Sequence, residues 1–427
     1  NTLASGGYEV ANSLRFNSGS SDYLNRTPSG ASSTKTKFTY NCWVKRSKLG
    51  TEQNLIEAGT SSNERTYLSL GVFGTDELSF VHRTGGSNAI VVTGTNLLRD
   101  VSAWYMITLK YDSTDGTANN RVRLFINNVE VAYTTQTMPS SNATTYINNN
   151  TAHFISKASH AGERYLDGYL SEVVMVDATA LNPDSFSEVD EDSGILKPIS
   201  VSGLTFGTNG FYLDFEDSGA LGADVSGNTN NFTVNNLTAI DQSTDTCTTN
   251  FATLNSIAFQ NAGDRLSEGN LRLDGTNASA HSLGIGTIAV NQGKWWFETE
   301  LDAIGGTYPQ IGVRSVDVNN TVESYVGQIT GGAGYASHGV IAVDGSNVST
   351  GGTTYTSGDI INVGLDLDGN KIYWYKNGTL MNSGGTSITN RYYTFAVSQQ
   401  SNTGHWFCNF GAGTLYAITS GNTDGND

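Results

Sequence analysis

The sequence contains little proline, little cysteine and little charge. Among its 427 residues there are 5 prolines and 3 cysteines, and charged residues make up only 15%. Cys42, Cys247 and Cys408 are odd in number and far apart, so they indicate neither a disulfide framework nor a metal-binding motif. No apolar run is long enough to cross a membrane as a helix, and we therefore expect no membrane insertion.

Basic residues are also scarce. The 23 Lys and Arg residues face 40 Asp and Glu residues, which gives a formal net charge of −17. A nucleic-acid partner would require basic residues that neutralise phosphates, so we expect no nucleic-acid binding. The acidity itself mainly indicates solubility, with divalent-cation binding through clustered Asp and Asn as the less favoured alternative.

Aromatic residues and glycine are plentiful. The chain has 20 Tyr, 17 Phe, 6 Trp and 49 Gly residues, which is enough to fill several small cores joined by tight turns. A length of 427 residues suggests two or three domains.

Strand patterns occur throughout the sequence, whereas long amphipathic helix patterns are missing. In 104–112, Tyr105, Ile107, Leu109 and Tyr111 alternate with residues of the other face. A second alternating stretch, 121–131, contains Asn127-Asn128 where a two-residue hairpin turn would fit. We predict three successive antiparallel strands over 104–133.

The same local design recurs downstream. In 359–368, Ile361, Val363, Leu365 and Leu367 share one face, and turns are predicted at 369–370 and at Asn377-Gly378. We therefore predict an all-β protein of two antiparallel, jelly-roll-like β-sandwiches joined by an irregular β/loop connector. The expected boundaries are 1–190 for the first domain, 191–255 for the connector, 256–420 for the second domain and 421–427 for a tail.

The one helical signal is short. Asn182-Pro183-Asp184 offers an N-cap, a proline at the first helical position and an acidic first turn, which predicts a single helical turn near 183–188.

The first domain resembles laminin-G-like, concanavalin-A-like domains over about residues 8–188. The resemblance depends on the order of an opening strand, two tryptophan-containing strands, a hairpin and a late DGYLSEV strand. These segments are 13–16, 21–24, 38–46, 104–131 and 165–176.

The second domain resembles the SPRY family over about residues 256–417. The segment 358–378, GDIINVGLDLDGNKIYWYKNG, is the most diagnostic stretch of the chain. The segments GKWWFETELD (293–302), PQIGVR (309–314) and 393–410 are similar to other strands of that family.

The pairing of these two domains in an acidic chain is similar to virion proteins of tailed bacteriophages. This resemblance implies a location on the tail or capsid surface, with assembly in the cytoplasm of the bacterial host. It implies other virion proteins, a host-surface glycan or protein, and further copies of the chain as partners. The expected function is non-enzymatic recognition of the host surface, in a tail fibre or a capsid decoration. A purely structural component is the alternative, and a polysaccharide depolymerase is a distant third.

A catalytic site is not expected, because the motifs that would support one are incomplete. Glu298, Glu300 and Asp302 alternate on one strand face, and a retaining glycosidase needs two carboxylates about 5–5.5 Å apart. However, Ala303 interrupts the E-x-D-x-x-E pattern of concanavalin-like glucanases, and the strand matches an early SPRY strand, so we expect these acids on a solvated face. No G-x-S-x-G nucleophile motif is present.

Ligand binding is expected at loops on the rims of the sandwiches. Aromatic loop residues can stack on a sugar or a peptide, while the four strand tryptophans Trp295, Trp296, Trp374 and Trp406 are expected mostly in the core. The alternative for each candidate is an exposed loop residue without a ligand. The candidates are His160, Arg164, Tyr308, Tyr325, Tyr335, His338 and Tyr355.

Calcium is the one cofactor for which the sequence offers candidate ligands. Calcium takes six to eight oxygen ligands, and many laminin-G-like domains bind it at the sandwich rim. Asp112, Asp115, Asn119 and Asn120 form an oxygen-rich turn, and Asp22 lies on an early loop. We favour a hydrated turn over a calcium site.

Overall fold

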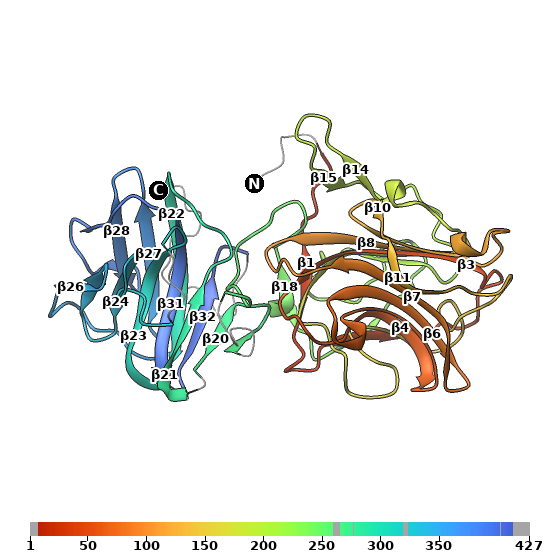
Figure 1. The fold of residues 1–427 in the computed structure, drawn as a ribbon, viewed down its shortest axis with the longest axis horizontal. Helices are drawn as coiled ribbons and strands as arrows, with labels where there is room; N and C mark the ends of the chain where they lie inside the picture. Colours follow the sequence, from red (N-terminus) through yellow and green to blue (C-terminus); the bar gives the residue numbers. More distant parts are fainter. Residues whose placement is uncertain (1–6, 259–264, 276, 319–322, 402, 413–427) are drawn as a thin grey trace. The chain divides into compact units, whose positions relative to one another are not determined.

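The computed structural model describes residues 7–258, 265–275, 277–318, 323–401 and 403–412. The predicted tail at 421–427 lies outside these residues. Contacts divide the chain into unit 1, Asn1–Asn250, and unit 2, Phe251–Asp427. Both units consist of antiparallel β-strands, which confirms the predicted fold class (Figure 1). Within the described ranges, no helix is long and apolar enough to cross a membrane.

Unit 1 is a sandwich of two sheets, named here after a central strand. The β3 sheet has the order β10-β9-β8-β3-β13-β1-β18, with β16 beside β13. Its strands are β1 (Ser13–Phe16), β3 (Lys37–Arg46), β8 (Trp104–Asp112), β9 (Val122–Ile126), β10 (Val129–Glu130), β13 (Gly168–Asp177), β16 (Phe211–Leu213) and β18 (Gln242–Ser243).

The second layer of unit 1 is the β5 sheet, with the order β11-β7-β6-β5-β4-β12-β2-β17. Its strands are β2 (Tyr23–Arg26), β4 (Gln53–Ser61), β5 (Glu64–Leu70), β6 (Glu77–Thr84), β7 (Ser87–Leu97), β11 (Tyr133–Thr137), β12 (His153–Ile155) and β17 (Thr233–Asn235). A small separate pair contains β14 (Ser187–Val189) and β15 (Leu196–Pro198).

Alternation of apolar residues explains the core of unit 1. Ile107, Leu109 and Tyr111 on β8 are fully buried against the other sheet, and Tyr105 packs at the margin of this core. The turn between β9 and β10 has positive φ at Asn127 (50°) and Asn128 (66°), as the Asn-Asn pair predicted. The predicted helical turn is the 3-10 turn η3 (Pro183–Ser185); the other short turns are η1 (Val72–Gly74), η2 (Ala118–Asn120) and η4 (Ala239–Asp241).

Much of the segment expected as a connector is built into unit 1. β16 pairs with β13, β17 with β2 and β18 with β1, so the segment adds strands to both sheets. Phe211 and Leu213 alternate along β16 and enter the core. Other apolar residues of the same region, Val201 and Phe206, cover the opposite face of the β3 sheet. The irregular spacing of these apolar residues hides this role in the sequence.

Unit 2 is also a sandwich of two sheets. The β22 sheet has the order β19-β20-β32-β22-β27-β28-β29, with β30 beside β28, and the β23 sheet has the order β21-β31-β23-β24-β25-β26. The strands are β19 (Leu266–Ser267), β20 (Arg272–Asp274), β21 (Asn277–Ile285), β22 (Lys294–Ala303), β23 (Gly306–Ser315), β24 (Gly332–Ala336), β25 (Ile341–Val343), β26 (Ser346–Ser349), β27 (Ile360–Asp366), β28 (Lys371–Lys376), β29 (Thr379–Leu380), β30 (Thr386–Ser387), β31 (Tyr393–Ser401) and β32 (His405–Asn409).

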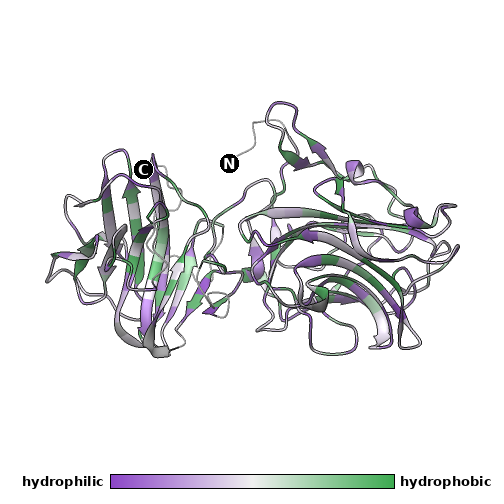
Figure 2. Ribbon diagram, in the orientation of Figure 1, coloured by the Kyte–Doolittle hydropathy of each residue, from purple (hydrophilic) through white to green (hydrophobic). Residues whose placement is uncertain are grey.

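The β27–β28 hairpin forms as the sequence predicts. Ile361, Val363 and Leu365 are buried in the core of unit 2, and Asn377-Gly378 turns with φ values of 47° and 78°. Hydrophobic residues line the strands of both units, and hydrophilic residues predominate in the connecting loops (Figure 2).

Candidate functional site

The loop that leads from β12 to β13 brings two of the predicted ligand residues together. His160 and Arg164 lie over the face of the β5 sheet that points away from the core, near Arg65 of β5 and Glu57 of β4. The Arg65 guanidinium donates to His160 Nδ1 at 3.4 Å, and the same His160 nitrogen lies 3.8 Å from Glu57 Oε1. We call this group the charged cluster; its members are Glu52, Glu57, Arg65, Tyr67, His160, Glu163 and Arg164.

Glu57 anchors the loop to the sheet. Its side chain is completely buried, and Oε1 accepts hydrogen bonds from the backbone N (2.8 Å) and the hydroxyl (2.7 Å) of Ser159. Asn54 Nδ2 donates to Oε2 at 2.6 Å. Because a buried carboxylate with several donors holds its partners firmly, the loop has a fixed position over the sheet.

Tyr67 forms the aromatic floor of the charged cluster. The Arg65 guanidinium lies 4.7 Å from the Tyr67 ring centroid, and the Arg164 guanidinium lies 5.4 Å from it. Both separations fall within the range of cation–π attraction. Arg164 Nε also lies 3.1 Å from Glu52 Oε2.

Several buried polar atoms of the cluster lack partners. Glu52 Oε1, Arg65 Nε and Arg164 Nη1 are buried and have no hydrogen-bond partner among the described residues. Buried polar groups nearly always have a partner, and ordered water or a polar ligand could each supply the bonds that these three atoms lack.

Burial shifts the pKa values of two members of the charged cluster, His160 and Glu52. It lowers the pKa of His160, and the neighbouring Arg65 lowers that pKa further. It raises the pKa of the Glu52 carboxyl. A neutral His160 leaves Nδ1 free to accept the bond from Arg65, which agrees with the observed geometry.

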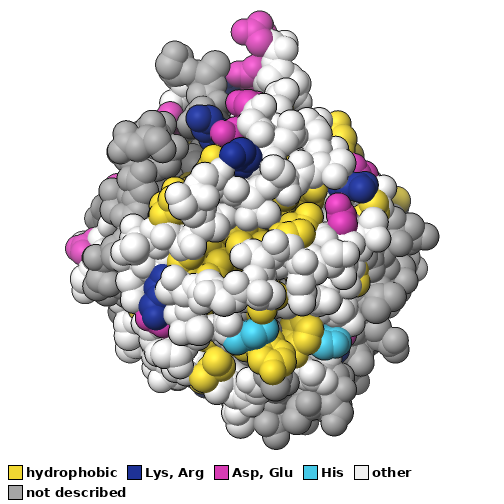
Figure 3. All heavy atoms as spheres, turned by 90° about the vertical axis from the view of Figure 1, so that its left-hand side faces the viewer, with side chains coloured by type: hydrophobic (Ala, Val, Ile, Leu, Met, Phe, Trp, Pro, Cys, Tyr) yellow, Lys and Arg dark blue, Asp and Glu magenta, His cyan; other side chains and the backbone are white. Residues whose placement is uncertain are grey.

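In unit 2, Tyr308 and His338 form a pair at the rim. Their ring centroids are 4.0 Å apart, and Tyr308 is 47% exposed. Tyr308 has φ 56° at a bulge of β23, a conformation that costs a residue with a Cβ about 1–2 kcal/mol. Such local strain often accompanies function. Figure 3 shows one face of unit 2, where histidine side chains lie beside hydrophobic ones.

Tyr325 belongs to a second aromatic pair. Its ring lies edge-on to His281 at 4.5 Å, and its hydroxyl donates to Gln400 Oε1 at 3.2 Å. The described contacts do not join this pair to Tyr308 and His338.

Tyr335 and Tyr355 are not rim residues, contrary to the expectation from the sequence. They are 0% and 3% exposed. The Tyr355 hydroxyl donates to the carbonyl oxygens of Pro309 (2.7 Å) and Tyr335 (2.8 Å), and the Tyr335 ring packs 5.7 Å from Trp374. The other residues of β24 (GAGYA) are glycine and alanine. The Tyr335 ring is therefore the large side chain that this strand contributes to the core.

The predicted calcium ligands bond within their own turn. Asp112 Oδ1 accepts from the N (3.0 Å) and the hydroxyl (2.6 Å) of Thr114, and Asp115 Oδ1 accepts from Thr117 N (2.7 Å). Asn119 and Asn120 are exposed in η2.

Asp22 belongs to a different place, since it is buried beside β2 and accepts from Asn17 N at 3.0 Å. In the part of the chain that the structure describes, no three His, Cys, Asp or Glu side chains are grouped as metal ligands. The turn therefore has the geometry of a self-bonded hairpin loop, and calcium binding stays a prediction.

The acids of β22 differ from one another in exposure. Asp302 is exposed and Glu300 is half-buried, but Glu298 is only 3% exposed, so the predicted solvated face is wrong for Glu298. Its carboxylate accepts hydrogen bonds from Trp296 Nε1, Asn362 Nδ2 and Asn409 Nδ2. Burial, followed by the charge of Asp302, raises the pKa of Glu300.

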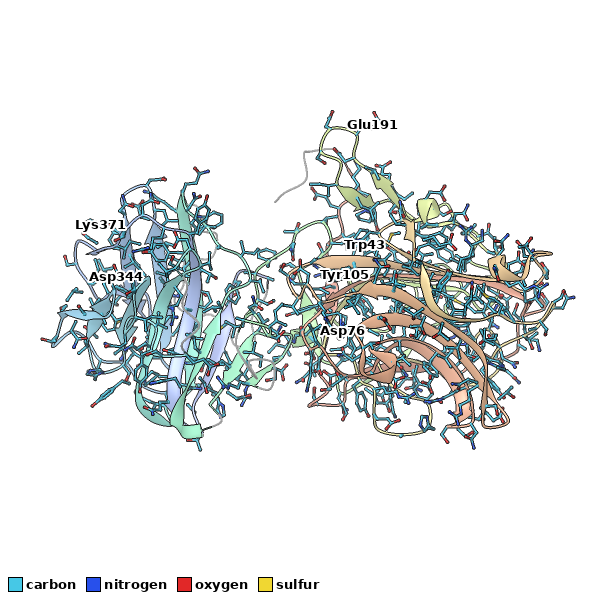
Figure 4. The ribbon with its side chains drawn as sticks, viewed as in Figure 1. Trp43, Asp76, Tyr105, Glu191, Asp344 and Lys371 are labelled. Atoms are coloured by element: carbon cyan, nitrogen blue, oxygen red, sulfur yellow. The ribbon has the colours of Figure 1, made fainter. Side chains whose placement is uncertain are left out.

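The sequence did not reveal a groove in unit 1 of about 400 Å³. Exposed Leu97 and Val129 border it, and Tyr105, labelled in Figure 4, lines it. Its residues come from the ends of separate strands, so no single stretch of sequence predicts the groove. The lining residues are Asn96, Leu97, Leu98, Tyr105, Ile126, Asn127, Val129, Glu130 and Val131.

The fold defines a protein of two β-sandwich domains. Comparison with known families identifies both domains. Residues 18–185 match the concanavalin A-like lectin/glucanases superfamily, and residues 294–408 match the SPRY domain. Both predicted resemblances are confirmed. No curated protein matches the chain.

Solved structures of low identity are similar to parts of the chain. A human SPRY domain is 16% identical, with 33% of this chain and 91% of that chain covered and a TM-score of 0.27. A candidate carbohydrate-binding protein of Bacteroides ovatus ATCC 8483 is 17% identical, with 53% and 59% covered and a TM-score of 0.37. A heptameric SAP-like pentraxin of Limulus polyphemus is 13% identical, with 46% and 100% covered and a TM-score of 0.30.

Proposed function

We propose that this chain is a non-enzymatic recognition protein on the surface or tail fibre of a virion, where its rim loops bind glycans or proteins of the host-cell surface. The charged cluster carries the proposal. It combines the Tyr67 ring, two guanidinium groups and buried polar atoms without partners among the described residues, where the loop between β12 and β13 lies over β5 of the lectin-type domain. The strained, exposed Tyr308 beside His338 supplies a second contact point in unit 2.

The non-enzymatic part of the proposal is supported by the surroundings of the β22 acids. Glu298 accepts from three uncharged donors and is shielded from solvent, which suits a positioning role. General acid–base catalysis needs a carboxyl group that reaches the substrate within hydrogen-bond distance.

The virion setting rests on the pairing of the two domains in one acidic chain. We propose assembly in the cytoplasm of the bacterial host and a homo-oligomer that contacts other virion proteins. Repeated copies would add many weak contacts into a strong attachment.

The test uses the purified full chain and the bacteria on which the particle grows. We expect the chain to bind the cells, or polysaccharide or protein extracted from their surface. Arg164→Ala should weaken binding about tenfold, because it removes a guanidinium from the centre of the cluster. Arg99→Ala is the matched control, since Arg99 is 57% exposed and lies outside the cluster.

Failure to bind cells or any surface extract would contradict the proposal, and unchanged binding by Arg164→Ala would contradict the use of the charged cluster. Cryo-electron microscopy of the particle provides an independent check. The recognition rims should face outward from a fibre or capsid.

The apolar groove beside Tyr105 favours a second candidate function, in which the chain is a structural part of the tail or capsid. Leu97 and Val129 are 47% and 68% exposed, and apolar surface of this kind suits contact with another protein. In that case the groove and the charged cluster would both be covered by neighbouring subunits in the particle.

A further inference from the structure

Three strands of the β22 sheet place polar residues in one row on the face away from the core. In the strand register, Glu298 of β22 lies opposite Asn409 of β32 and Asn362 of β27. Asn362 Nδ2 donates to Glu298 Oε1 at 2.9 Å, and Asn409 Nδ2 donates to Oε2 at 3.3 Å. The exposed fractions are 3% for Glu298, 0% for Asn362 and 7% for Asn409, so the row is buried although it faces outward.

Trp296 lies beside this row and is held at two points. Its indole Nε1 donates to Glu298 Oε1 at 3.1 Å. Its ring lies over Gly364 of β27, where an added Cβ would be 3.4 Å from the ring. The ring centroid lies 5.1 Å from that of Tyr375 on β28. Both rings are partly exposed, so together they form a fixed aromatic surface.

A strand face that is exposed to solvent does not need a buried carboxylate held by neighbouring side-chain amides. Burying a carboxylate costs free energy, and no Lys, Arg or His among the described residues forms an ion pair with Glu298. Asn362 Oδ1 is buried and has no hydrogen-bond partner in the described part of the chain. A free-energy cost of this kind is typical of positions where buried polar groups hold a binding surface in one geometry.

We propose that this face binds a neutral saccharide, with a sugar ring stacked on Trp296 and Tyr375 and sugar hydroxyls donating to neighbouring carboxylates. Glu300 and Asp302 lie along the same strand face as Glu298 and are open to solvent in part or in full. The face therefore offers acceptors and negative charge, which complements hydroxyl donors and repels acidic glycans. This inference rests on the function proposed above and names a ligand class and a place for it.

The test is a fluorescence titration of the full chain with neutral oligosaccharides: maltoheptaose, cellohexaose and mannohexaose. At least one probe should bind, and Trp296→Ala should weaken its binding about tenfold or more. Trp295→Ala is the matched control. Trp295 is the adjacent residue, it is 46% exposed, and its indole bonds to the Gln292 carbonyl away from the row.

Two milder variants separate positioning from folding. Gly364→Ala adds one methyl group under the Trp296 ring and should weaken binding two- to threefold while the thermal transition of unit 2 stays in place. Glu298→Gln keeps the shape of the side chain and removes its charge. If Glu298 positions Trp296, this variant should shift the tryptophan emission spectrum and weaken binding, whereas a merely structural role would leave the spectrum unchanged.

The outcomes distinguish this inference from the proposed function. If the chain binds host cells but no neutral probe, the inference fails and the proposed function stands. If a neutral probe binds and Trp296→Ala has no effect, the site lies elsewhere and the inference again fails. Binding of alginate oligomers, or of an oligolysine peptide, at Trp296 would also overturn it. If neither cells nor probes bind, both proposals fail.

Discussion

Both units bury a carboxylate on a sheet face that points away from the main core, but they compensate it in different ways. In unit 1, Asp245 meets a cation, since its Oδ2 lies 2.6 Å from Lys45 Nζ and both side chains are 1% exposed. In unit 2, the donors to Glu298 among the described residues are all uncharged.

The coverings of the two faces differ as well. Apolar residues that follow β13 in the chain, including Phe186, Val201 and Phe206, cover the outward face of the β3 sheet. The face around Glu298 instead carries two partly exposed aromatic rings. Removing one partner of the covered pair would leave a buried charge without its counterion. Among the described residues, the carboxylate of Glu298 has no such counterion to lose.

The largest effect is expected from breaking the Lys45–Asp245 pair. Lys45→Met leaves Asp245 buried without its cation and should lower the free energy of unfolding of unit 1 by about 3–5 kcal/mol. Calorimetry of the full chain should show this as a lower transition temperature for unit 1 alone.

The double variant Lys45→Met with Asp245→Asn is the control, because it removes both charges and keeps an acceptor for the Trp104 indole, which donates to Asp245 Oδ1 at 3.0 Å. It should recover at least half of the loss. Equal losses in the single and double variants would show that packing, and not charge, decides the stability of this face.

The next effect concerns pH and the same covered face. Glu172 of β13 accepts from the Tyr212 hydroxyl at 2.9 Å to each oxygen, and burial raises its pKa from 4.5 to about 7. Because the folded state holds this proton more tightly than the unfolded state, the contribution is present below pH 4.5 and is lost as the pH rises through 7. The total change is about 3 kcal/mol.

Urea unfolding at pH 5, 6, 7 and 8 measures this change. Glu172→Gln should remove it, so the difference between the variant and the original chain should grow with pH in favour of the variant. Comparing the two chains cancels His153, whose pKa burial lowers to about 4 and which acts in the opposite direction below pH 6.5. A constant difference across the series would contradict a titrating Glu172.

The smallest effect sharpens the comparison directly. Glu298→Gln should change the stability of unit 2 by about 1 kcal/mol or less, since it gives up one hydrogen bond and no ion pair. Asp245→Asn should lower the free energy of unfolding of unit 1 by about 3–5 kcal/mol, because it leaves the Lys45 ammonium group buried without its counterion. Similar costs for the two variants would mean that Glu298 is a structural charge after all.

Local signals made the hairpins predictable. The Asn127-Asn128 and Asn377-Gly378 turns and the alternation of Ile361, Val363 and Leu365 depend only on residues that are neighbours in sequence. Both domain resemblances drew on these same stretches, which is why they agree with the family matches.

Burial on the outer faces of the sheets could not be predicted in the same way. Whether Glu298 is solvated depends on Asn362 and Asn409, which lie 64 and 111 residues away in the chain. The burial of Tyr355 likewise depends on Pro309 and Trp406. Alternation assigns a side chain to a face, but only the neighbouring strands and loops decide what covers that face.

The pairing of β1 with β18 also has a consequence for synthesis. Ser13 lies opposite Ser243, so the first strand of unit 1 waits for a partner 230 residues later. At about 5–20 residues per second, that wait lasts on the order of 10–50 seconds on the ribosome. Until then β1 has only one of its two neighbours, and a nascent chain stopped near residue 190 would expose open strand edges to other chains. Unit 1 thus completes its β3 sheet only after Ser243 has emerged, a few residues before unit 2 begins at Phe251.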